Sequence, residues 1–139
     1  MNLAAAFYDR LTGDGTLTGM LSTYKGHPAV FTIDPAPEEA IMPYLVTAGN
    51  VVDSPDDTKT SRGRDVWRDI RCYATRSGSV IAIEAIAERV RELFHRHELT
   101  VEDHETWMAE CSGPIKADED DCYARIITVK LNLNESEGS

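Results

Sequence analysis

Hydrophobic and polar residues alternate along the last strand-like segment of the chain, "CYARIITVKLNLN". Alternation with a period of two predicts a β-strand that buries one face. The inward face comprises Tyr123, Ile127, Val129, Leu131 and Leu133, and the opposite face comprises Ala124, Thr128, Lys130 and Asn132. Arg125 falls among the inward residues, and we interpret it as a side chain whose charged head reaches water at the end of the strand.

A longer period marks the segment "SGSVIAIEAIAERVRELF". Its apolar residues recur every three or four positions, which predicts a helix with one buried stripe. The stripe comprises Val80, Ile83, Ile86, Ala87, Val90, Leu93 and Phe94. Ser77 or Ser79 can cap the start of the helix, and arginines near its end suit the helix dipole. We expect this helix to lie against a sheet.

The N-terminal third starts with helical spacing and continues as proline-rich chain. Apolar residues four apart predict the first helix: Leu3, Phe7 and Leu11. Residues 17–21 predict one short further turn. Four of the six prolines then fall between residues 28 and 43, which predicts extended connecting chain with a brief strand at residues 30–33.

Two strand-like segments, residues 43–52 and 65–75, lie on either side of a long polar stretch. In the second segment, one face carries Val66, Arg68, Ile70 and Cys72, and the other carries Trp67, Asp69, Arg71 and Tyr73. Residues 98–103 and 106–113 are two further short candidates, and Gly113-Pro114 should end the latter. The acidic run "KADEDD" predicts a turn before the last strand.

The order of helix, strands, helix and strands predicts one α+β domain over residues 1–139. We expect an antiparallel sheet with one long helix packed on a face, an additional N-terminal helix, and a frayed tail at residues 134–139. The chain shows no internal repeats.

The polar stretch at residues 53–64 is long for a connection between two paired strands, which usually takes about 2–5 residues. It mixes acids with bases: Asp53, Asp56, Asp57, Lys59, Arg62 and Arg64. Such a loop is either a tolerated flexible insertion or an arm that becomes ordered on a partner. We favour the second interpretation and treat these six residues as candidate partner-binding residues.

The charge balance argues against binding to nucleic acid through the phosphate backbone. The chain has 24 acidic and 14 basic residues and a formal net charge of -10, and a surface of that sign repels phosphate. No apolar run approaches the length of a membrane-spanning helix, so we expect no membrane partner, and the N-terminus does not resemble a secretory signal. The three cysteines lack CxxC spacing, which predicts reduced thiols in a protein made in the cytoplasm.

Residues that could carry chemistry do not form a recognisable site. His95 and His97 point to different sides of a helix, and neighbours of His104 alternate between faces of a strand. The run from Asp118 to Asp121 lacks the glycine and distal glutamate of a calcium loop. Each cysteine fits a small core residue: Cys72, Cys111 and Cys122. We therefore predict no catalytic residue, no metal and no cofactor.

Trp67 and Tyr73 lie on the more polar face of their strand. Aromatic residues in such a position usually cover a neighbouring element, within the chain or between subunits. They could also line a small-molecule pocket. We treat them as a possible intersubunit surface.

Several of these segments, in this order, resemble the tail-completion or tail-terminator proteins of long-tailed bacteriophages and gene transfer agents. The resemblance rests on "LTGDGTLTGML", "MPYLVTAG", "VWRDIRCYA", "RSGSVIAIEAIAERVRELF" and "YARIITVKLNLN". It covers about residues 3–133, and what matches is the order and spacing of elements. The Ser-Gly turn before the Ala- and Ile-rich helix is among its most specific parts.

The resemblance implies a structural, non-catalytic virion protein. Such proteins form a ring, typically of six copies, on the head-proximal end of the tail tube; the ring stops tube growth and docks the head connector. DNA passes through its hole without sequence-specific binding. The alternatives are a head-completion or neck protein, which shares the ring arrangement, and a small α+β ligand-binding domain or enzyme.

Overall fold

A computed structural model describes residues 3–33, 36–47, 52–55, 63–76, 79–95, 104–106 and 109–135. The helices are α1 (Leu3–Thr12), α2 (Gly15–Thr18) and α3 (Ile81–Phe94). The strands are β1 (Thr23–Tyr24), β2 (His27–Pro28), β3 (Val30–Phe31), β4 (Tyr44–Val46), β5 (Val52–Pro55), β6 (Gly63–Thr75), β7 (His104–Thr106), β8 (Glu110–Lys116) and β9 (Cys122–Glu135). The α+β prediction is confirmed.

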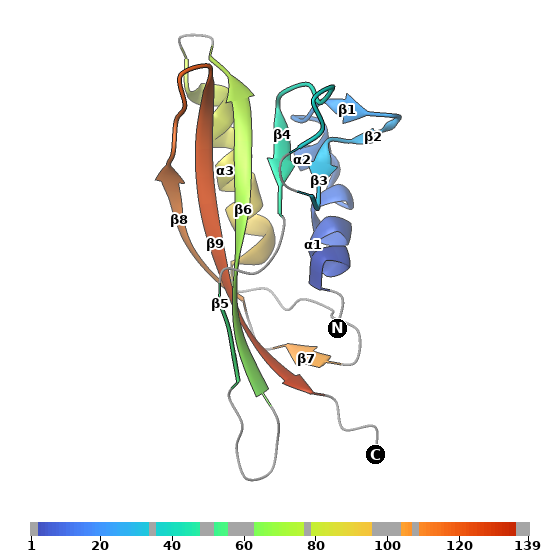
Figure 1. Cartoon of the computed structure of the whole chain (residues 1–139), viewed down its shortest axis with the longest axis vertical. Helices are drawn as coiled ribbons and strands as arrows, with labels where there is room; N and C mark the ends of the chain where they lie inside the picture. Colours follow the sequence, from blue (N-terminus) through green and yellow to red (C-terminus); the bar gives the residue numbers. More distant parts are fainter. Residues whose placement is uncertain are drawn as a thin grey trace.

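The two longest strands, β6 and β9, form the centre of the main sheet (Figure 1). They pair antiparallel without a break from Gly63↔Asn134 to Thr75↔Cys122. On one side, β4 and β5 pair with different halves of β6; on the other, β8 and β7 pair with different halves of β9. The strand order is therefore fixed by two long strands that each accept two short neighbours.

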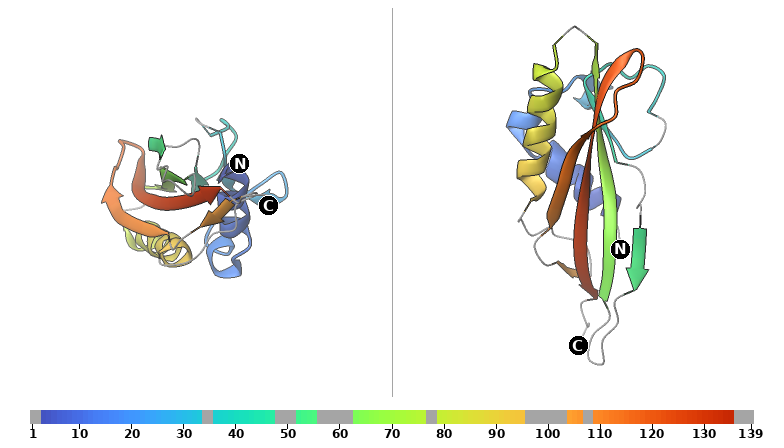
Figure 2. Two further views of the ribbon diagram at one scale, coloured as in Figure 1. Left: turned by 90° about the horizontal axis from the view of Figure 1, so that it is seen from below. Right: turned by 90° about the vertical axis from the view of Figure 1, so that its left-hand side faces the viewer.

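Both longer helices lie on the same side of this sheet (Figure 2, right). The helical stripe predicted from the sequence is the buried side of α3: Ile83, Ile86, Ala87, Val90 and Phe94. Ser79 is not the cap of this helix: the N-cap is Val80, which makes no side-chain cap bond, and Ser79 Oγ accepts from the Ile81 N–H at 3.3 Å one position earlier. Residues of alternate positions on β6 and β9 complete the core beneath the helices, including Val66, Ile70, Ile127 and Leu131.

Side-chain contacts attach the N-terminal helices to α3. The rings of Phe7 and Phe94 lie 4.8 Å apart, and the Arg10 guanidinium donates to the Leu93 carbonyl at 3.1 Å. Asp14 caps α2 by accepting from the Leu17 N–H, and it also pairs with Arg89 on α3. The N-terminal helices are therefore part of the same packed layer as α3.

Four expectations about strands are wrong in detail. The pair β3–β4 is parallel, because the proline-rich chain between the two strands returns to the end at which β3 starts. The segment expected as one strand at residues 43–52 contributes to two strands, since the 13-residue β6 has room for two partners in line. Gly113-Pro114 does not end β8, which continues through an irregularity in register to Lys116. The polar stretch begins later and ends earlier than expected, because β5 extends to Pro55 and β6 starts at Gly63.

Two predicted segments fall wholly or largely outside the described residues: the candidate strand at 98–103 and the tail at 134–139. Among the helices that the structure describes, none has the length and apolar character needed to cross a membrane.

Candidate interaction surface

The main sheet has two unlike faces. The face beneath the helices buries every second residue of β6 from Val66 to Ala74. The opposite face carries the residues in between, and of these Trp67, Asp69 and Tyr73 are half-buried while Arg71 is exposed. Figure 2 (right) shows no helix on that side. We call the part of this face formed by β6, β9 and β8 the open face.

Register places the side chains of the open face in rows, because directly paired residues project to the same side. One row is Glu110, Lys130 and Trp67, and the Lys130 Nζ lies 5.3 Å from the centre of the Trp67 ring. The next row contains Thr128, whose hydroxyl donates to Asp69 at 2.7 Å. A third row is Ile115, Ile126 and Arg71. Aromatic, aliphatic and charged side chains thus lie in neighbouring rows on the open face.

A pocket of about 310 Å³ lies beside the open face, towards the β8–β9 turn. Its walls include the rings of Tyr44 and Tyr73, whose centres are 5.3 Å apart. The remaining lining residues are Ala36, Met42, Val46, Arg71, Glu119, Asp121 and Cys122. Tyr73 therefore packs mainly within the chain, as aromatic residues on such a face usually do, and Trp67 does not line this pocket.

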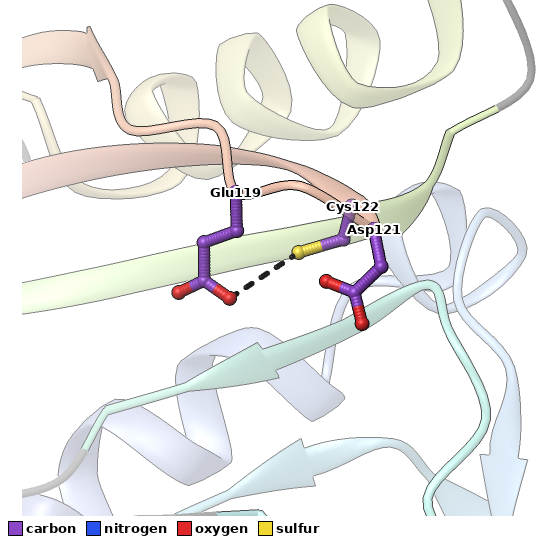
Figure 3. A group of neighbouring side chains, drawn as sticks. All are labelled: Glu119, Asp121 and Cys122. Atoms are coloured by element: carbon purple, nitrogen blue, oxygen red, sulfur yellow. Dashed lines mark hydrogen bonds between the residues drawn. The ribbon is translucent and has the colours of Figure 1, made fainter.

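Glu119, Asp121 and Cys122 form a group of potential metal ligands within the described residues, with ligand atoms within 4.8 Å of one another (Figure 3). The Cys122 thiol donates to Glu119 Oε2 at 3.7 Å. Burial raises the pKa of this thiol, and the nearby carboxylates of Glu119 and Asp121 raise it further. Because metals bind the thiolate, binding of a metal here would require removal of this proton.

The other two thiols are also held in their protonated form. Burial raises the pKa of Cys72 to about 12 and that of Cys111 to about 11. His95 accepts a hydrogen bond on Nδ1 from the Cys111 N–H, so it serves to join the end of α3 to β8. His97 and the neighbours of His104 at 102 and 103 lie outside the described residues. These contacts are structural, and they fit the expectation that the cysteines are core residues.

Two arginines are buried, and sequence reasoning missed the partners of both. Arg125 does not reach water: its guanidinium pairs with Asp118 at 2.7 Å and with Glu84 of α3 at 3.8 Å. The interpretation of Arg125 as a side chain with its head in water is therefore wrong, because the acidic turn folds back to supply a carboxylate. Arg68 donates to the hydroxyl and the carbonyl of Thr47, and its guanidinium lies 5.3 Å from the Phe7 ring.

The structure describes two of the six candidate partner-binding residues. Asp53 lies in β5 opposite Val66, and Arg64 lies in β6 opposite Pro55. Both were expected in a loop, but the paired strands extend to include them. Four other candidates lie outside the described residues: Asp56, Asp57, Lys59 and Arg62.

Residues 5–121 match the family described as tail completion protein gp17. The chain belongs to this family. A solved structure described as the virion of a native gene transfer agent particle contains a chain of the same fold, with a TM-score of 0.78. The similarity covers 95% of this chain and 94% of that chain at 16% sequence identity. No curated protein matches the sequence.

The predicted resemblance to tail-completion proteins is confirmed by this membership. A tail-completion protein is a structural component of a virion tail, which associates with other tail and head proteins. The open face and the pocket are accordingly surfaces to consider for contacts between proteins.

Proposed function

We propose that copies of this protein form a closed ring, six in number, at the head-proximal end of the tail tube. The ring stops growth of the tube, offers the surface to which the head connector docks, and lets DNA pass through its hole. The observation that carries this proposal is the family match, which extends over residues 5–121. The ring assembles in the cytoplasm of the bacterial host.

The fold provides what a ring requires. A closed ring uses heterologous contacts, in which one patch of a copy meets a different patch of the next copy. The sheet has one face covered by helices and one face without them, so its two sides differ in chemistry. The acidic excess of the chain supports a hole through which DNA slides without adhering.

Electron microscopy of particles made without this protein tests the proposed role. We expect overlong tails and heads that are not joined to tails, because nothing stops the tube or completes the junction. Tails of normal length beside unjoined heads would instead favour a head-completion or neck protein. Normal, joined particles would contradict both roles.

The hairpin formed by β5 and β6 is the proposed arm that contacts a neighbouring protein. Asp53 and Arg64 lie near the end of this hairpin, and the other four charged candidates lie in the connection between its strands. Ordering of a polar connection on a partner costs entropy that the interface must offset. The six candidates are proposed to act together at this contact.

The register of the hairpin allows a precise shortening. Because Pro55 pairs with Arg64, residues 56–63 can be replaced by Asn-Gly, which suits a two-residue turn between antiparallel strands. We expect the shortened chain to remain folded by circular dichroism and to lose binding to tail tubes in co-sedimentation. A second variant keeps the full length of the connection but replaces its charged residues at 56, 57, 59 and 62 by serine. Comparison of the two variants separates the effect of charge on binding from the effect of loop length. Undiminished binding of both variants to tail tubes would contradict the proposal that this hairpin contacts a neighbouring protein.

A further inference from the structure

We propose that the open face is the surface through which one copy of this protein contacts the next, with Ile115 and Ile126 at its centre. This inference rests on the proposed ring, and it specifies where on the chain the contact lies. The partner is a second copy of the same chain.

The first argument is the electrostatic cost of bringing copies together. Each copy carries a formal net charge of -10, so two copies repel each other over most of their surfaces. The open face is close to neutral, because its ionisable residues are three acids and two bases: Asp65, Asp69, Glu110, Arg71 and Lys130. A face so near neutrality adds little to the repulsion between two acidic copies.

The second argument is the apolar content of this face. Ile115 is 57% exposed, and it lies directly opposite Ile126 on β9. Arg71 continues the same row. Trp67 lies on the same face of β6, two rows further along. Burial of apolar side chains is the main favourable term in association, and aromatic and arginine side chains are enriched at such contacts.

Ile33, Ile41 and Ile81 are the other strongly exposed isoleucines among the described residues, and two of them, Ile81 and Ile41, have more acidic surroundings. Ile81 is 77% exposed at the start of α3, on the side of the helix that also exposes Glu84 and Glu88. Ile41 is 66% exposed and follows Glu38 and Glu39, which are exposed as well. Compared with Ile81 and Ile41, Ile115 thus lies on a strand surface with a smaller excess of acidic residues.

The test compares matched substitutions at Ile115 and Ile81. Self-association of the purified full-length chain is measured by analytical ultracentrifugation, alone and with tail tubes, at low and at high salt. We expect Ile115→Glu and Ile115→Lys each to raise the dissociation constant of self-association about tenfold or more, as loss of a central contact does. Ile81→Glu and Ile81→Lys should change it less than about threefold, and circular dichroism should show all four variants folded.

Salt dependence gives a second readout. Because salt screens the repulsion between acidic copies, self-association of the wild-type chain should become stronger as salt rises. Weakening with salt would indicate a contact made by opposite charges and would overturn the inference. Equal effects at Ile115 and Ile81, or an effect at Ile81 alone, would also overturn it while leaving the ring intact. A wild-type chain that never self-associates, even on tail tubes, would overturn the ring and this inference together.

Discussion

Gly113 occupies a position in β8 that other residues can take only with strain. Its φ is +94°, and a Cβ atom there would lie 2.7 Å from the Ile126 carbonyl oxygen and 3.0 Å from the Ile115 nitrogen. Both neighbours are backbone atoms, so neither can move aside without disturbing the β8–β9 pair. This glycine thus allows β8 to continue past its irregularity and to place Ile115 on the open face.

Gly113→Ala should lower the free energy of unfolding by about 1–3 kcal/mol, because it adds an unfavourable backbone conformation and a close contact. Urea denaturation of the two proteins measures the difference. Gly15→Ala is the matched control, since no atom lies within 4 Å of a Cβ at that helical position and alanine favours helix. A Gly113→Ala protein as stable as the control would show that the strand adjusts without cost.

Asp118 holds the β8–β9 turn by its carboxylate. Its Oδ1 accepts from the Ala124 N–H at 3.0 Å and from the Arg125 guanidinium at 2.7 Å. The hydrogen bond from Ala124 is the largest cause that lowers the pKa of Asp118, and the bond from Arg125 adds to it. Buried Arg125 would otherwise lose its nearest anion.

A group whose pKa is lower in the folded state contributes stability above its unfolded pKa and loses it as pH falls through the folded pKa. Asp118→Asn should therefore be less stable than wild type at neutral pH, and the difference should shrink in acid. Unfolding free energies measured by denaturant titration across the acidic range give the comparison. Asp120→Asn, which changes an exposed residue of the same turn, is the matched control. A constant difference between Asp118→Asn and wild type would contradict the ionic role.

At the scale of elements, the short helix α2 is stabilised mainly by its contacts with α3. It has four residues, and an isolated helix of that length is unstable in water. Asp14 is its N-cap, and the two carboxylate oxygens of Asp14 also accept from Arg89 at 2.7 and 2.9 Å. Such a two-point pair fixes orientation as well as distance.

A double-mutant cycle with Asp14→Ala and Arg89→Ala should give a favourable coupling larger than the cycle for Arg89 and Glu92. The second pair lies within one helix and its glutamate is more exposed, so water weakens it more. Thermal unfolding of the single and double variants supplies both couplings. Equal couplings would show that the two-point geometry adds nothing to the packing of α2.

At the scale of the whole molecule, the distribution of charge disfavours binding to DNA and leaves one face suited to contact with protein. The net charge of -10 repels a phosphate backbone, whereas the proposed contact with an equally acidic copy uses the nearly neutral open face. The long β6–β9 pair forms the centre of this face and extends beyond the helices (Figure 1).

The purified chain should therefore bind duplex DNA with no measurable affinity at low salt, where attraction to phosphate would be strongest. Fluorescence anisotropy of a labelled duplex measures this. A variant carrying Glu119→Lys, Asp120→Lys and Asp121→Lys is the control, because it reverses the charge of one exposed turn and should show some binding. Saturable, salt-sensitive binding by the wild-type chain would contradict a passage that does not hold DNA.

The sequence by itself determined what depends on neighbours along the chain. Alternation in β6 and β9 and the stripe on α3 set which face of each element is buried, since the period of side chains follows from local backbone geometry. These patterns placed Val66, Ile127 and Val90 in the core correctly. The family resemblance also came from the order and spacing of such elements.

Only the tertiary structure decided which elements meet. Nothing local indicates that β3 and β4 run parallel, that β4 and β5 share β6, or that Asp118 turns back to Arg125. The rows of the open face likewise join residues that are far apart in the sequence, such as Trp67 on β6 and Lys130 on β9. Contacts of this kind depend on the summed packing of distant segments, which no short window of sequence contains.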